Sequence, residues 1–100
     1  MSFGQRIKEL RENKKLLQRH LAASLEIDTP MFSKIERGER KAKREQVLKL
    51  AKLLETDVDE LLTAWLADKI YDLVKDETTA VNAIKVAETT LKYSKIEKQL

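Results

Sequence analysis

Apolar residues recur every three or four positions in six successive segments of the chain, which is the spacing of one face of an α-helix. The first segment begins at Ser2, whose hydroxyl can form a capping box with Gln5, and ends at the polar run 13–15. The same spacing predicts a second helix from about Leu17 to Leu25.

The third segment is short and carries its own start and stop signals. Asp28 or Thr29 can cap it, and Pro30 fits a first helical turn because no N–H is needed there. Gly38 suits the left-handed backbone that ends many helices. A charged loop follows, and the pattern resumes as a fourth helix over about residues 44–54.

Two further helices occupy the last part of the chain. Asp57 can cap a fifth helix whose apolar stripe runs from Val58 to Val74. Residues 76–79 interrupt the stripe, and a sixth helix continues to about Leu91. The chain has two glycines and one proline, and tight hairpins depend on these residues. We therefore expect an all-α fold.

The composition narrows the function before any motif is considered. With no cysteine and one histidine in 100 residues, the chain offers no disulfide framework and no metal cluster, and we expect no cofactor. No stretch approaches the roughly 20 apolar residues of a membrane span, and the first residues do not resemble a secretory signal, so we expect a cytoplasmic protein. An enzyme is the least supported class, because no motif places a nucleophile beside His20 and no glycine-rich phosphate loop is present.

The charge is distributed unevenly along the chain. The net charge is +3, but residues 1–50 contain 13 Lys/Arg against 7 Asp/Glu, whereas residues 51–100 contain 7 against 10. A basic half of this kind suits contact with a polyanion such as nucleic acid, although a solvated helical surface rich in lysine has the same composition.

A helix, a short turn, a second short helix with a polar outer face and a basic loop form the layout of a helix-turn-helix module. The residues that carry it are Gln18, Leu21–Ala22, Phe32–Gly38, Val47–Ala51 and Asp59–Leu62. On these motifs, residues 3–62 resemble the five-helix DNA-binding domain of phage repressors, Cro proteins and Xre-type regulators. The resemblance implies a lambda repressor-like domain over residues 1–64, a recognition helix at about 29–37, and double-stranded DNA as the partner.

The resemblance also assigns positions to the DNA bases. The outward, base-facing positions of the recognition helix are Thr29, Pro30, Ser33 and Lys34. Lys34 can donate to guanine O6 and N7, and Ser33 can donate or accept, whereas Pro30 can only touch a thymine methyl or take part in indirect readout. For each of them, an ordinary exposed or capping position is the alternative.

A second set of residues is expected to meet the DNA backbone. Gln18 stands where the amino terminus of the second helix meets a phosphate in such proteins. The cations around the loop after the recognition helix are Arg37, Arg40, Lys41, Lys43 and Arg44. Phosphate contacts predict a steep salt dependence, about 0.9 log unit per phosphate neutralised, which Asp28 and Glu39 oppose by repulsion. A solvated charged loop is the alternative.

The family places an arginine on the first helix against a glutamate on the third. These residues are Arg11 and Glu36 here, and we expect a structural pair rather than two independent surface charges. If the pair is partly buried, removing one partner should cost on the order of 3 kcal/mol through the stranded charge.

The chain departs from the family pattern at several helix ends. Lys15, Glu26 and Glu55 replace the glycines that are usual after three of the helices. Because a left-handed residue there costs about 1 kcal/mol, we expect these ends to close differently. Leu17 likewise replaces the usual serine or threonine cap of the second helix.

A five-helix module is complete near Leu62, yet the apolar stripe continues into a helical hairpin over residues 65–100, which the fifth helix enters without a break. We expect this hairpin to dimerise through Trp65, Leu66, Ile70, Leu73, Val74, Val81, Ile84 and Leu91. The alternative is a hairpin that folds back on its own DNA-binding domain. A homodimer doubles the DNA contacts and reads palindromic half-sites about one helical turn apart.

The sequence therefore favours a small, sequence-specific DNA-binding regulator, a repressor that occupies a palindromic operator as a homodimer. The competing class is a protein-interaction module, such as an antitoxin whose hairpin binds a protein partner while DNA binding serves autoregulation. A controller of restriction-modification genes is a third reading within the DNA-binding class.

Overall fold

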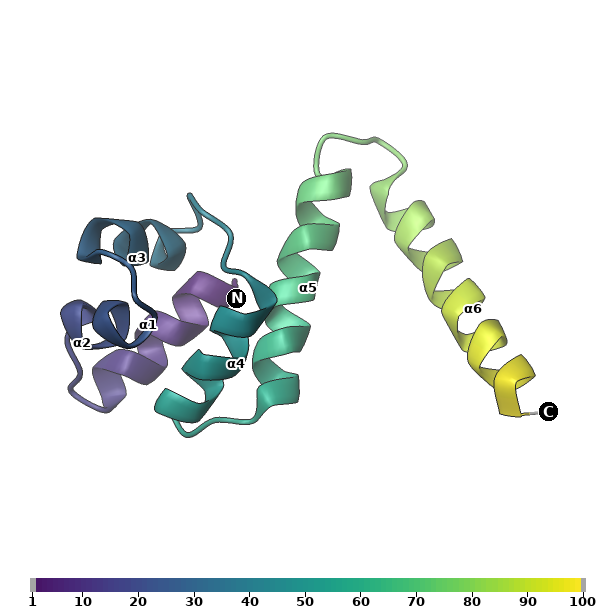
Figure 1. Cartoon of the computed structure of the whole chain (residues 1–100). Coiled ribbons are helices and arrows are strands. Elements are labelled where there is room, and N and C mark those ends of the chain that lie inside the picture. Colours follow the sequence, from purple (N-terminus) through teal and green to yellow (C-terminus); the bar gives the residue numbers. More distant parts are fainter. Residues whose placement is uncertain (1, 100) are drawn as a thin grey trace. The chain divides into compact units, whose positions relative to one another are not determined.

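A computed structural model describes residues 2–99, which form six helices and no strand (Figure 1). The helices are α1 (Phe3–Asn13), α2 (Gln18–Ser24), α3 (Thr29–Glu36), α4 (Arg44–Leu53), α5 (Val58–Val74) and α6 (Ala80–Gln99). The expected all-α fold is confirmed. The chain divides into two compact units, Met1–Lys69 and Ile70–Leu100, each of which is described separately below.

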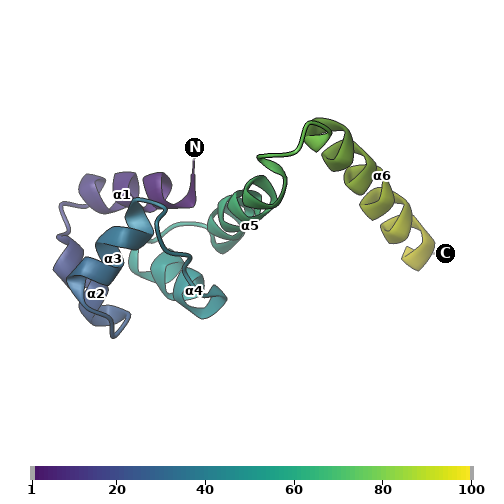
Figure 2. The same cartoon turned by 90° about the horizontal axis from the view of Figure 1, so that it is seen from above.

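The first unit encloses one hydrophobic core between α1 to α4 and the first part of α5. Its fully buried side chains include Ile7 of α1, Leu21 of α2, Phe32 of α3, Leu50 of α4 and Leu61 of α5. Burying one such side chain contributes roughly 1.5–3 kcal/mol, so these contacts hold the five helices together. Figure 2 shows the same helices from a second direction, with α3 beside α2 in both views.

The helix starts follow the capping signals of the sequence in two cases and not in a third. Ser2 and Gln5 form the expected capping box, and Asp28 rather than Thr29 caps α3, its Oδ1 accepting from the backbone N–H of Met31 at 2.7 Å. At α2, Leu17 has no polar side chain to offer. Instead, the backbone N–H of Leu17 donates to Nδ1 of His20 at 3.0 Å, so the lone histidine helps to order this helix start.

The first four helices end in the same way, which corrects one expectation. Lys15, Glu26 and Glu55 adopt left-handed backbone with φ of 58°, 58° and 52°, as Gly38 does at 77°. At each end two backbone N–H groups reach back to carbonyls of the last turn, as when Leu16 N donates to Arg11 O at 3.0 Å. The prediction that the three non-glycine ends would close differently was wrong. The two hydrogen bonds and the packing beyond them outweigh a strain of about 1 kcal/mol per residue.

Gly4 allows α1 to approach the end of α3 closely. A Cβ placed on Gly4 would lie 2.3 Å from the carbonyl oxygen of Glu36 and 2.7 Å from that of Ile35. Both atoms belong to the backbone and cannot rotate away. A residue without a side chain is therefore required where α1 crosses α3.

The second unit consists of the end of α5, the turn after it and α6. Its apolar side chains are largely open to solvent, with Leu73 80%, Val81 63% and Leu91 62% exposed. A groove of about 350 Å³ is lined on one side by Ile70, Leu73 and Val74 of α5. Its other side is formed by Ala83, Ile84, Ala87, Glu88 and Leu91 of α6.

Candidate nucleic-acid interface

Helix α3, the predicted recognition helix, packs its apolar face against α1 and α2. Phe32 and Ile35, three residues apart, are 0% and 2% exposed, and they bury the inner side of the helix. The short connection between α2 and α3 contains the left-handed Glu26 and ends at the Asp28 cap. This arrangement is a helix-turn-helix, and it leaves the opposite face of α3 open.

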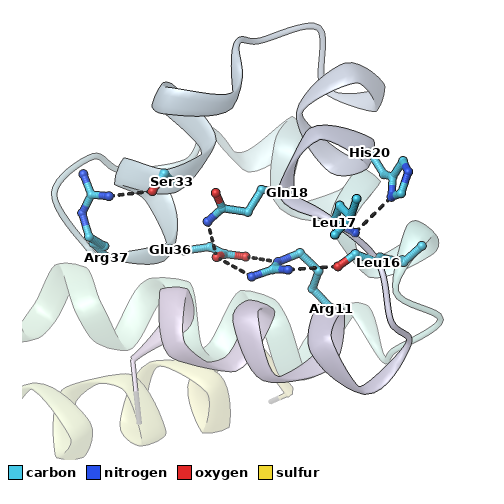
Figure 3. Close-up of polar contacts among 8 residues, drawn as sticks. All are labelled: Arg11, Leu16, Leu17, Gln18, His20, Ser33, Glu36 and Arg37. Atoms are coloured by element: carbon cyan, nitrogen blue, oxygen red, sulfur yellow. Dashed lines mark hydrogen bonds and ion pairs between the residues drawn. The ribbon is translucent and has the colours of Figure 1, made fainter.

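The four positions assigned to base contact are not equally accessible. Pro30 and Lys34 are exposed, whereas Thr29 and Ser33 are half-buried. The Ser33 hydroxyl accepts a hydrogen bond from Nη1 of Arg37 at 2.6 Å (Figure 3). Arg37 Nε also pairs with Glu39 at 2.5 Å, so this guanidinium has two partners within the domain. DNA must break or share these Arg37 hydrogen bonds if the guanidinium is to reach a phosphate.

The loop after α3 presents its cations to solvent. Arg37, Arg40, Lys41, Lys43 and Arg44 are all exposed. Ala42, in the middle of this run, is the exception at 4% exposed, and its carbonyl accepts from the indole Nε1 of Trp65 at 2.8 Å. A buried small residue between exposed cations turns their side chains outward and anchors the loop on the domain.

A buried polar network ties α3 to its scaffold (Figure 3). Arg11 makes two hydrogen bonds to the Glu36 carboxylate, from Nε at 2.7 Å and from Nη2 at 3.1 Å. The side chains are 10% and 2% exposed. Arg11 Nη1 also donates to the carbonyl of Leu16 at 2.9 Å, and Gln18 Nε2 donates to Glu36 at 2.8 Å. Among the described residues, no buried side-chain nitrogen or oxygen is left without a partner.

The network includes Gln18, for which the family resemblance implied a contact with a phosphate. Its amide nitrogen points to Glu36, so Gln18 links the start of α2 to the end of α3. A groove of about 500 Å³ opens beside it. The residues that line this groove are Ser2, Gln5, Lys8, Gln18, Ser33, Glu36 and Arg37. Lys8 of α1 thus shares a surface with the predicted DNA-contacting residues, and the sequence reasoning had not selected it.

Charged partners shift the pKa values of three groups in this unit. The hydrogen bond to Glu36 raises the pKa of Arg11, against the opposing effect of burial. On the surface, the hydrogen bond between Arg6 and Glu60 at 2.6 Å lowers the pKa of Glu60 and raises that of Arg6. Each pair thus favours the charged form of both of its partners.

The spacing of apolar residues did not predict the role of Trp65, nor that of Gly4 described above. The apolar stripe of α5 assigned Trp65 to the dimer surface, but the structure places it in the core of the first unit, 6% exposed. The large ring fills the space between α5 and the loop at Ala42, and its N–H finds an acceptor there. The indole N–H of a buried tryptophan needs a hydrogen-bond acceptor, and this requirement could have suggested a partner within the same chain.

Other kinds of site find little support in the part of the chain that the structure describes. Within residues 2–99, no three His, Asp or Glu side chains gather in a way that could hold a metal ion. Over the same residues, every helix is too short or too polar to cross a bilayer.

The comparison with known families agrees with the geometry of α2 and α3. Residues 2–64 match the family described as a helix-turn-helix domain, which is well over half of the chain. The chain belongs to this family of DNA-binding domains. Neither a curated protein nor a solved structure matches it at a significant level.

Proposed function

We propose that this protein is a sequence-specific transcriptional regulator of the Xre and phage-repressor type, which binds a palindromic operator as a homodimer and represses. The observation that carries the proposal is the open polar face of α3 beside an exposed basic loop on a helix-turn-helix domain. Lys34 and Ser33 supply base contacts, and the loop cations supply phosphate contacts. Occupying an operator suffices for repression and requires no catalytic step. Such a regulator works in the cytoplasm, where its DNA lies.

The homodimer is supported by the open apolar surface of the hairpin. Besides the groove residues, Val81 of α6 is 63% exposed. Of the expected dimer residues that belong to the first unit, Leu66 is 43% exposed and Trp65 is withdrawn into the core. Single exposed apolar residues are common, but a contiguous set that lines a groove marks an interaction site. A second copy of the same hairpin offers the same apolar ridge and groove, and two-fold symmetry makes such a contact self-complementary.

Full-length protein and two variants test this proposal. Light scattering of the wild type should give a dimer, and Ile84→Glu together with Leu73→Glu should give a folded monomer, because a charge cannot be buried unpaired in the contact. Selection from a randomised duplex pool should enrich an inverted repeat with the wild type. Lys34→Ala should relax the preference at one position of each half-site at a cost of about 1–3 kcal/mol. A wild type that enriches no sequence at any salt concentration would refute the proposal.

The exposed groove also supports a second candidate function, in which the hairpin binds a different protein and DNA binding serves autoregulation. An antitoxin has this organisation. Co-purification of a stable second protein with the wild type, but not with the Leu73→Glu and Ile84→Glu variant, would favour it over the homodimer. A clean homodimer with no bound protein would exclude it.

A further inference from the structure

The α3–α4 loop is attached to the domain at its centre by one side chain of α5. Nε1 of Trp65 donates to the carbonyl oxygen of Ala42 at 2.8 Å, and both residues are buried. Ala42 is flanked directly by Lys41 and Lys43. Because consecutive Cα atoms are about 3.8 Å apart, the anchored carbonyl fixes the starting points of both lysine side chains.

The remaining backbone contacts lie at the two ends of the loop. At its start, Arg40 N donates to the carbonyl of Lys34 at 3.3 Å. At its end, Lys43 N donates to Oε1 of Gln46 at 2.9 Å, which closes the first turn of α4. The indole hydrogen bond joins the middle of the loop to α5.

The same ring also orders two cations. Lys69 Nζ lies 3.6 Å from the ring centroid of Trp65, and Cζ of Arg44 lies 5.3 Å from it. A cation over an indole face is held in place by the negative charge of the π system. Trp65 thus contacts the loop through its N–H and two neighbouring positive charges through its face.

We infer that Trp65 is a positioning residue for DNA binding. It holds the loop in the conformation in which the Lys43 side chain faces the phosphates, and its ring keeps the Arg44 guanidinium nearby. The inference rests on the proposed function, since it requires that this loop grips DNA. It goes beyond that function by assigning part of the affinity to a buried aromatic residue outside the recognition helix.

A role in core packing alone makes a different prediction. Poorer packing lowers the fraction of folded protein but leaves the number of phosphates neutralised by each folded molecule unchanged. A displaced loop lowers that number. The slope of log K against log salt concentration counts the phosphates neutralised, at about 0.9 for each, so it separates the two roles.

The experiment compares full-length wild type with Trp65→Phe, which keeps an aromatic ring and removes the N–H donor. The probe is a labelled mixed-sequence duplex of about one and a half turns, titrated over a potassium chloride series. The slope should fall by about 0.9 for each phosphate that the variant no longer neutralises, which at 0.1 M salt corresponds to about an eightfold weaker affinity per phosphate. Leu54→Val, a buried change at the end of α4, is the matched control and should keep the wild-type slope.

Each outcome decides the inference. A Trp65→Phe protein with the wild-type slope, whatever its affinity, would overturn the positioning role. If Trp65→Phe does not fold, benzothienylalanine at this position keeps the shape of the ring without the N–H, and the same slope comparison applies. If the wild type binds no duplex even at low salt, the proposed function itself fails, which is a separate result.

Discussion

The buried pair of Arg11 and Glu36 allows the sharpest test of how the recognition helix is held. Arg11→Met removes the charge and both hydrogen bonds to the carboxylate while keeping much of the side-chain volume. It leaves Glu36 with Gln18 as its remaining partner and deprives the Leu16 carbonyl of a donor. Since the Glu36 side chain is 2% exposed, water cannot replace the missing guanidinium without a rearrangement.

The expected magnitude follows from this geometry. Breaking a buried ion pair by removing one partner costs about 3–5 kcal/mol, a large share of the roughly 5–15 kcal/mol that stabilises a typical domain. Glu36→Gln should cost a similar amount, because it strands the guanidinium. In the double variant the second change should cost much less, giving a coupling energy of about 2 kcal/mol or more between Arg11 and Glu36.

Urea denaturation followed by circular dichroism measures the free energies of unfolding of the wild type, the two single variants and the double variant. The hydrogen bond to Glu36 raises the pKa of Arg11 above its ordinary value. The contribution of Arg11 is therefore fully present below the ordinary pKa of arginine and is lost only as the pH rises through the higher folded-state pKa, so the cycle should give the same result at neutral and mildly alkaline pH. Single costs under about 1 kcal/mol with no coupling would refute the reasoning, since that is the behaviour of an exposed pair.

Four further predictions address other features of the first unit. Lys15→Gly should raise the free energy of unfolding by about 1 kcal/mol, because glycine adopts the left-handed conformation without strain; a lower midpoint in urea would contradict this. Gly4→Ala should lower it by about 1–3 kcal/mol through the clash with two backbone carbonyls, and an unchanged midpoint would show that α1 can shift. Glu39→Gln should tighten binding to a mixed-sequence duplex, as it frees Arg37 and removes a like charge from the phosphates, whereas Glu97→Gln should not. Glu60→Gln should lower the melting temperature at pH 7 but not well below pH 4.5. Arg6 lowers the pKa of Glu60, so the stabilisation by this pair is present above the ordinary pKa of Glu60 and is lost as the pH falls through the lowered pKa.

Much of the fold was predictable because its signals are local. The spacing of Phe32 and Ile35, the Ser2–Gln5 capping box and the left-handed Gly38 each depend on residues within one or two helical turns. The Arg11–Glu36 contact followed from the family resemblance rather than from the periodicity of the chain.

The remaining features depend on contacts between distant segments. Nothing near Gly4 in the sequence indicates that a backbone carbonyl of α3 will lie against it. Trp65 fits the apolar stripe of the extension equally well whether it faces a second copy or its own loop, and only the folded chain selects Ala42 as its partner. The left-handed backbone of Lys15 and Glu26 was not predictable from local preferences either, because tertiary packing overrides a preference of about 1 kcal/mol.

Trp65 is also the single tryptophan of the chain. Its emission spectrum is therefore an optical signal from one known place, the joint between α5 and the basic loop. Indole fluorescence responds to nearby charge and to hydrogen bonding of the N–H, and here both come from the loop and from the two cations over the ring. The unlabelled wild-type protein thus carries its own reporter of loop movement, which can be followed in real time as duplex is added.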